Sequence, residues 1–170
     1  MRLTLIASLL LAIVTPGLAQ DEMVTLQPAQ VGEIFCLARL GNDMGPVTGL
    51  LSPGLTKAIA DAEVNNTAWE QANPGDKPPL GDGIPWQSWP DYAPECTVGE
   101  VTVNAAGLAE VEIHYNFPST PHAGYSDTLL LAKTAVEGLG AEVWRIGNLR
   151  FEDGNDLVAE LVRAFNEEGA

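Results

Sequence analysis

Residues 108–117 read LAEVEIHYNF, and this stretch decides the fold class. Val111, Ile113 and Tyr115 occupy alternate positions, and the residues between them are polar or charged. Because successive side chains of a strand point to opposite faces, this alternation predicts a strand with one buried face and one wet face. The chain is therefore expected to contain a sheet that is covered mainly on one side.

Three further stretches with strand character lie around this one, over residues 97–103, 127–134 and 141–151. The first is separated from residues 108–117 by a turn that ends at Gly107, and the last two are separated by a turn containing Gly138. Strands that follow one another with short links pair as antiparallel neighbours. Together they predict a four-stranded antiparallel meander.

Helical patterns flank the predicted sheet on both sides. Residues 28–40 carry apolar side chains at i, i+3, i+4 and i+7, and a short helical turn is expected over residues 46–51. Ser52-Pro53 supplies an N-cap and a first-turn proline for a helix to about Ala72. A last amphipathic helix follows Asp153-Gly154-Asn155. The order predicts an α+β fold, with N-terminal helices packed on the meander and a C-terminal helix.

The first nineteen residues have the composition of a cleavable secretory signal peptide. Arg2 precedes an apolar run over residues 3–14, and small residues lead up to Ala19. The alternative is an uncleaved anchor, but twelve residues of helix reach only about 18 Å of a hydrocarbon core of about 30 Å. We therefore expect a signal peptide over 1–19, one domain over 20–170, and a soluble periplasmic or secreted protein with no membrane insertion after cleavage.

Two cysteines, Cys36 and Cys96, are the only ones in the chain. In an oxidising compartment they are expected to form one disulfide, closing a loop of about 60 residues. The alternative is a reactive thiol, but no histidine lies near either cysteine in the sequence. The bridge would join the N-terminal helices to the start of the sheet.

Charge limits the partners of this protein. Eight basic residues stand against 23 acidic ones, a formal net charge of −15, which becomes one unit more negative when Arg2 leaves with the signal segment. Such a surface repels nucleic-acid backbones and anionic lipid, whereas a basic protein or a cation is compatible with it. The alternative is that the charge serves only solubility.

A long irregular segment over residues 73–95 is the main candidate for a binding site. It holds six prolines and three glycines, together with aromatic and acidic residues. Aromatic faces stack on apolar or cationic groups, and carboxylates accept hydrogen bonds, as in sugar, cation or peptide recognition. The alternative is that the tryptophans only anchor an irregular cover onto the core. The candidate binding residues here are Trp86, Trp89, Tyr92, Asp82 and Asp91.

The strands offer few groups for chemistry. Tyr115 is the one obvious polar side chain on the inward face of its strand, and it is either a binding or catalytic participant or a core tyrosine. His114 shares the outer face with Glu110 and Glu112, where cross-strand pairing with Arg145 or Arg150 is favoured over cation binding. Nucleophile elbows, Cys-x-x-Cys and phosphate-binding glycine loops are absent from the sequence. No catalytic residue, metal or cofactor is therefore predicted.

Three short motifs suggest a family. Residues 143–149 (VWRIGNL), residues 51–55 (LSPGL) and residues 81–86 (GDGIPW) resemble those of exported bacterial domains of unknown function. Such domains are placed among cone-shaped, cystatin-like folds similar to nuclear transport factor 2. The resemblance implies helices that precede a curved antiparallel sheet and pack in its concave face, and it makes a homodimer possible. The family often has an aspartate where this chain has Asn148, which puts any role for a carboxylate there in doubt.

These observations favour a non-enzymatic periplasmic or secreted binding domain, whose partner is an exported protein or a small ligand. One alternative is a small-pocket enzyme of dehydratase or isomerase type, with Tyr115 as a participant. Another, motivated by the negative charge, is an inhibitor or immunity protein against a basic secreted enzyme.

Overall fold

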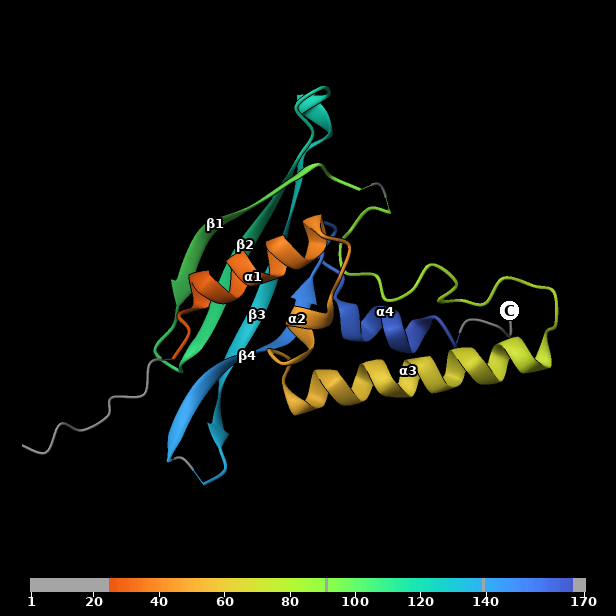
Figure 1. Cartoon of the computed structure of the whole chain (residues 1–170), viewed down its shortest axis with the longest axis horizontal. Coiled ribbons are helices and arrows are strands. Elements are labelled where there is room, and N and C mark those ends of the chain that lie inside the picture. Colours follow the sequence, from red (N-terminus) through yellow and green to blue (C-terminus); the bar gives the residue numbers. More distant parts are fainter. Residues whose placement is uncertain (1–24, 91, 139, 167–170) are drawn as a thin grey trace, which may run out of the picture.

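The structure, a computed structural model, describes residues 25–90, 92–138 and 140–166. It confirms the α+β class, with helices before an antiparallel sheet and one helix after it (Figure 1). The predicted signal peptide, residues 1–19, lies outside the described residues. Among the described residues, no helix is both long enough and apolar enough to span a bilayer.

The elements follow the predicted order closely. The strands are β1 (Glu95–Val103), β2 (Leu108–Asn116), β3 (Tyr125–Val136) and β4 (Ala141–Arg150). They pair as neighbours in the order β1-β2-β3-β4, and every pair is antiparallel. The helices are α1 (Pro28–Leu40), α2 (Gly45–Thr48), α3 (Pro53–Ala72) and α4 (Leu157–Arg163), with a 3-10 turn η1 (Pro121–Ala123) between β2 and β3.

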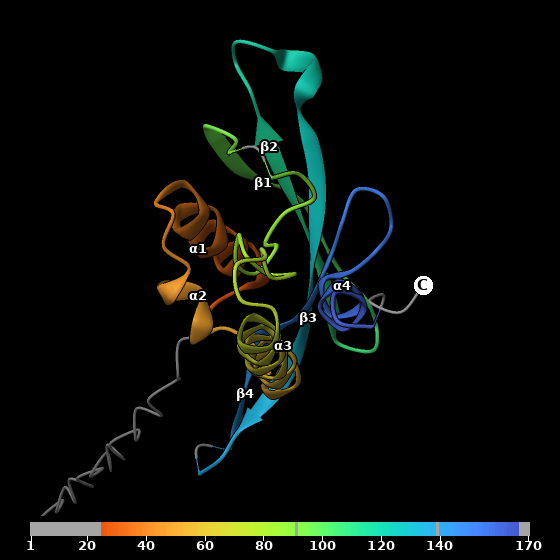
Figure 2. The same cartoon turned by 90° about the vertical axis from the view of Figure 1, so that its right-hand side faces the viewer.

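Helix α1 packs directly on β1 and β2, on the same side of the sheet as α2 (Figure 2). Its residues Val31 and Phe35 are fully buried. Between them, Gly32 brings the helix backbone so close to the sheet that a Cβ atom there would lie 2.8 Å from a methyl of Val111 and 2.9 Å from one of Val98. The absence of a side chain at Gly32 therefore sets the distance between helix and sheet.

The disulfide between Cys36 and Cys96 is present and confirms the predicted pairing. It joins the middle of α1 to the start of β1, with 5.2 Å between the two Cα atoms. Cys96 lies opposite Tyr115 in the β1–β2 register. The bridge thus fixes α1 to the start of the edge strand β1.

Helix α3 begins at a capped N-terminus. The Ser52 hydroxyl accepts a hydrogen bond from the backbone amide of Leu55 at 3.1 Å, and Pro53 is the first helical residue, as the sequence predicts.

The chain just before α3 also closes one border of the sheet. The Ser52 amide donates to the Ile146 carbonyl, and the Ile146 amide donates to the Leu50 carbonyl, both at 2.8 Å. The outer edge of β4 is thereby occupied at Ile146. The opposite border is β1, which is irregular between Val98 and Val101 and carries exposed glutamates, Glu95 and Glu100.

Asn148 holds the start of α4 against β4. Its side-chain nitrogen donates to Asp156 Oδ1 at 2.9 Å, and its oxygen accepts from the backbone amides of Leu149 at 2.9 Å and Val158 at 3.2 Å. An aspartate could not donate to Asp156 and would repel it. The amide at this position therefore has a structural role that a carboxylate could not fill.

Residues 73–94, which we call the cover loop, connect α3 to β1. The loop leaves the C-terminal end of α3 and folds back past α3 and α4 toward the sheet (Figure 1). The Leu80 amide donates to Asn66 Oδ1 of α3 at 2.8 Å. The loop is thus attached at its middle to the helix that precedes it.

Candidate functional site

Asp127 of β3 attaches the cover loop to the sheet. Its side chain points to the helix-covered face and is only 1% exposed. Oδ2 accepts from the Ser88 amide at 3.0 Å, and Oδ1 accepts from the Ser88 hydroxyl and from the Glu152 amide, the latter at 3.1 Å. One buried carboxylate therefore joins the loop, β3 and the chain after β4.

Burial raises the pKa of the Asp127 carboxyl above its usual value, while the hydrogen bonds from Ser88 and Glu152 act in the opposite direction. The pKa values of the neighbouring Tyr115 and Tyr125 are also raised. Burial raises the pKa of Tyr115 and of Tyr125, and the negative charge of Asp127 raises both further. The phenols therefore remain protonated, and Asp127 is the group in this cluster that titrates in acid.

Lowering the pH is expected to stabilise the wild-type protein relative to Asp127→Asn. The folded pKa lies above the unfolded value of about 3.9, so the folded chain binds the proton more tightly and gains stability as the pH falls through the folded pKa. Each unit of difference contributes about 1.4 kcal/mol. Urea unfolding of both proteins between pH 7 and pH 4 measures this trend.

Glu110→Gln provides the control of opposite sign, because the hydrogen bond from Arg150 lowers the pKa of Glu110. Relative to this variant, the wild type should lose stability as the pH falls below the ordinary glutamate pKa of about 4.3, so this pair is measured down to about pH 3. A constant difference between wild type and Asp127→Asn would contradict the expected titration.

The two tryptophans of the cover loop have different environments. Trp86 is half-buried and meets the core residue Phe35 edge-on, with 6.4 Å between ring centroids. Its carbonyl lies 3.5 Å from the Tyr115 hydroxyl. Trp89 is 56% exposed, and its indole Nε1 donates to Glu152 Oε2 at 3.1 Å. Trp86 is thus an anchor, whereas Trp89 is presented to solvent in a fixed orientation.

Tyr92 and Arg39 form a second part of the surface. The Tyr92 ring is 44% exposed, and the guanidinium of Arg39, from the last turn of α1, lies 4.9 Å from its centroid. Arg39 also donates to the side-chain oxygen of Gln87. Within the described residues no carboxylate lies within ion-pair distance of Arg39, so its charge is met by an aromatic face and an amide.

Trp89 borders three hollows in the surface. The Arg39 hollow, of about 410 Å³, lies inside the cover loop and is lined among others by Arg39, Trp86 and Tyr92. The α4 hollow, of about 380 Å³, lies between the loop and α4. The hairpin hollow, of about 470 Å³, lies between the loop and the tip of the β2–β3 hairpin. All three have volumes in the range of small-molecule sites.

The structure separates the predicted site residues into groups. Trp86, Trp89, Tyr92 and Asp82 all line the Arg39 hollow, where Asp82 also pairs with Lys77. Asp91 lies outside the described residues. Tyr115 is 1% exposed, and its ring stacks on Tyr125 with 4.7 Å between centroids. It lines none of the three hollows around Trp89.

On the outer face of the sheet, Glu110 has a different partner from His114 and Glu112. Glu110 pairs with Arg150 at 2.6 Å, which confirms one of the two expected pairings, whereas Arg145 donates to the Gly49 carbonyl. His114 lies 2.7 Å from Ser126 Oγ and 3.5 Å from Glu112. In the described part of the chain, no three His, Cys, Asp or Glu side chains are grouped closely enough to hold a metal ion.

Sequence reasoning missed several residues of this surface, namely Arg39, Phe117, Tyr125, Asp127 and Glu152. A signal for Asp127 was present, because it has the inward parity of Leu129 and Leu131 on the same strand. A charged residue in a buried register requires polar partners, and these come from the cover loop. For Arg39 and Glu152 the sequence contains no comparable signal.

Comparisons with known proteins found no matching family model, no matching curated protein and no matching solved structure. The resemblance to exported domains with a fold like that of nuclear transport factor 2 therefore stays a prediction.

Proposed function

We propose that this protein is an exported binding domain that captures a ligand or partner protein through the surface around Trp89, and that it is not an enzyme. The observation that carries the proposal is the state of Trp89 itself. It is more than half exposed, yet Glu152 fixes its indole, and it borders three hollows at once.

An exposed tryptophan with a fixed orientation suits recognition. Tryptophan and tyrosine supply large contact areas with few rotatable bonds, so little conformational entropy is lost on binding. Here Glu152 and the attachment of Ser88 to Asp127 hold the ring before any ligand arrives. The surface is therefore preorganised for contact.

The position of Tyr115 supports binding over the alternative of a dehydratase or isomerase. Its ring is enclosed between Tyr125 and the core, and its hydroxyl faces the Trp86 carbonyl. Burial also raises the pKa of this phenol well above its usual value, which makes it a poor general base at neutral pH.

The disulfide supports a location outside the cytoplasm, together with the signal peptide predicted over residues 1–19. A periplasmic or secreted site of action is therefore part of the proposal.

The test is capture from an extract of exported proteins and metabolites of the source cell, with the oxidised protein immobilised. Trp89→Ala and Tyr92→Ala should each reduce the amount captured by about tenfold or more, as expected for aromatic hot spots. Mass spectrometry identifies the captured species. Trp86 is a poor choice for this test because its contact with Phe35 makes it part of the core.

Leu37→Ala is the matched control, since Leu37 is 69% exposed on α1 and lies away from the three hollows. Near-ultraviolet circular dichroism verifies that each variant is folded. If Trp89→Ala retains full capture, the proposal is wrong.

A further inference from the structure

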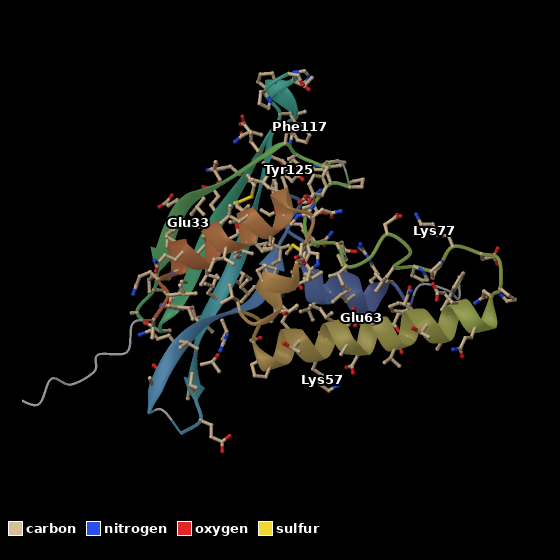
Figure 3. All side chains as sticks on the ribbon, viewed as in Figure 1. Glu33, Lys57, Glu63, Lys77, Phe117 and Tyr125 are labelled. Carbon is tan, nitrogen blue, oxygen red and sulfur yellow. A yellow bond between two sulfur atoms is a disulfide. The ribbon has the colours of Figure 1, made fainter. Side chains whose placement is uncertain are left out.

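The hairpin hollow has aromatic walls. Trp89 lies on the cover-loop side, Phe117 directly follows β2, and Tyr125, which is 7% exposed, is the first residue of β3. The rings of Phe117 and Tyr125 have centroids 6.4 Å apart, and Figure 3 shows both side chains near the end of the sheet that carries this hairpin. Three different segments of the chain therefore present aromatic rings to one space of about 470 Å³.

The charge within this hollow is negative. Glu152 lines it, and Asp127 is adjacent to Tyr125 on the strand and shares a hydrogen-bonding network with Glu152. The described residues that line it include the imidazole of His122 but no lysine or arginine. The pKa of Tyr125 is raised mainly by burial and then by the charge of Asp127; Arg39 and a hydrogen bond with the Trp89 backbone lower it, and Glu152 raises it by the smallest amount. Negative charge thus predominates around the phenol.

We propose that the hairpin hollow binds an organic cation, an ammonium or guanidinium group, between Trp89, Phe117 and Tyr125, with Glu152 as its counter-ion. The faces of aromatic rings attract cations through their quadrupoles, and the attraction grows where water is excluded. This inference rests on the proposed function and names the ligand class for one of the three hollows.

The Glu152 carboxylate is placed for this role without rearrangement. One of its oxygens accepts from the Trp89 indole, so the carboxylate is held at the edge of the ring whose face would meet the cation. The carboxylate can still accept a further hydrogen bond from an ammonium or guanidinium donor. The overall charge of −15 attracts cations to the surface as a whole.

The Arg39 hollow provides an internal contrast. It shares Trp89 with the hairpin hollow, but it contains the guanidinium of Arg39 and the Lys77-paired carboxylate of Asp82. A cation would be repelled there by Arg39. An organic cation is therefore expected to bind on the hairpin side of Trp89 and not in the Arg39 hollow.

The experiment titrates the oxidised protein with two pairs of probes and follows the Trp89 indole N–H by nuclear magnetic resonance. The small-molecule pair is choline and its uncharged carbon isostere 3,3-dimethylbutan-1-ol. The peptide pair is a blocked tripeptide with one central lysine and the same peptide with norleucine. The indole signal of Trp89 is assigned from its loss in Trp89→Phe.

We expect the charged member of at least one pair to shift the Trp89 signal at millimolar concentration and to bind more tightly than its neutral counterpart. Glu152→Gln keeps an oxygen for the indole but removes the charge, and it should weaken the cation about three- to fivefold. Glu137→Gln, at an exposed acid beyond the end of β3, should leave binding unchanged. Preference for choline identifies a small ligand, and preference for the lysine peptide a basic exported protein.

Equal binding of the charged and neutral members would overturn the inference, as would the absence of any shift with either cation. So would an unchanged affinity in Glu152→Gln. Each of these results leaves the capture test with Trp89→Ala intact, because that test does not depend on the charge of the ligand.

Discussion

Replacing both Cys36 and Cys96 by alanine is expected to lower the free energy of unfolding by about 4 kcal/mol. The bond closes a loop across 60 residues, and the chain-entropy model gives about this value for a loop of such length. The loop includes α2, α3 and the whole cover loop, so the bridge restricts the unfolded chain over about a third of its length. Both cysteines are buried, so the two small side chains add a minor packing loss.

Urea unfolding of wild type and the double variant, followed by circular dichroism, measures this difference. Wild type treated with a thiol reductant is the control, and its midpoint should move to that of the double variant. Equal midpoints for oxidised wild type and the variant would show that the bridge does not stabilise the fold.

Gly32→Ala is expected to destabilise the protein by about 2 kcal/mol, even though alanine favours helix over glycine by about 1 kcal/mol. The added Cβ would lie within 3 Å of methyl groups on Val98 and Val111, which are short, branched and packed. Helix α1 must then move away from the sheet or the two valines must leave their preferred rotamers. Gly32→Val should have a larger effect.

Gly54→Ala is the matched control, because its Cβ would meet only Ser52 Oγ at 3.8 Å, in the exposed first turn of α3. This change should leave stability unchanged or raise it slightly. Thermal unfolding of both variants beside wild type gives the comparison. Gly32→Ala as stable as Gly54→Ala would show that α1 is not held at its closest approach to the sheet.

The two long helices, α1 and α3, could be predicted from the sequence almost to the residue, whereas the short turn expected over residues 46–51 is the helix Gly45–Thr48. Ser52 and Pro53 mark the start of α3, and the predicted helix over residues 28–40 coincides with α1. These signals are local, since a cap and a proline act within one turn of their own position. The stripe in α1 also identified its buried face, with Val31, Phe35 and Ala38 in the core and Ile34 half-buried.

The strands were predictable in number and order but less so at their ends. The strand that was predicted to begin at Asp127 begins at Tyr125. The sequence did not reveal the two earlier residues because the charged Asp127, in the inward register, interrupts the apolar pattern. Ser88, the hydrogen-bond partner of Asp127, lies 39 residues earlier in the chain. Periodicity reports only neighbours along the sequence, so it cannot show a buried charge that is satisfied from such a distance.

The candidate surface was predictable as a region but not residue by residue. Composition singled out the cover loop, yet an irregular segment has no period, so the sequence could not distinguish half-buried Trp86 from exposed Trp89. The acidic partner of Trp89 proved to be Glu152, which lies 63 residues away beyond β4. That pairing depends on the tertiary arrangement alone.

The two borders of the sheet bear on how the protein behaves at high concentration. A straight outer strand with free backbone groups can template the addition of further chains and so seed fibres. Here residues 50–52 already use the hydrogen bonds of β4 at Ile146, and β1 is broken by its irregularity and carries the exposed residues Glu95 and Glu100. Two copies that met along β1 would also bring their exposed glutamates together, and these would repel each other. Copies of the molecule can thus reach high concentration without their sheets joining edge to edge.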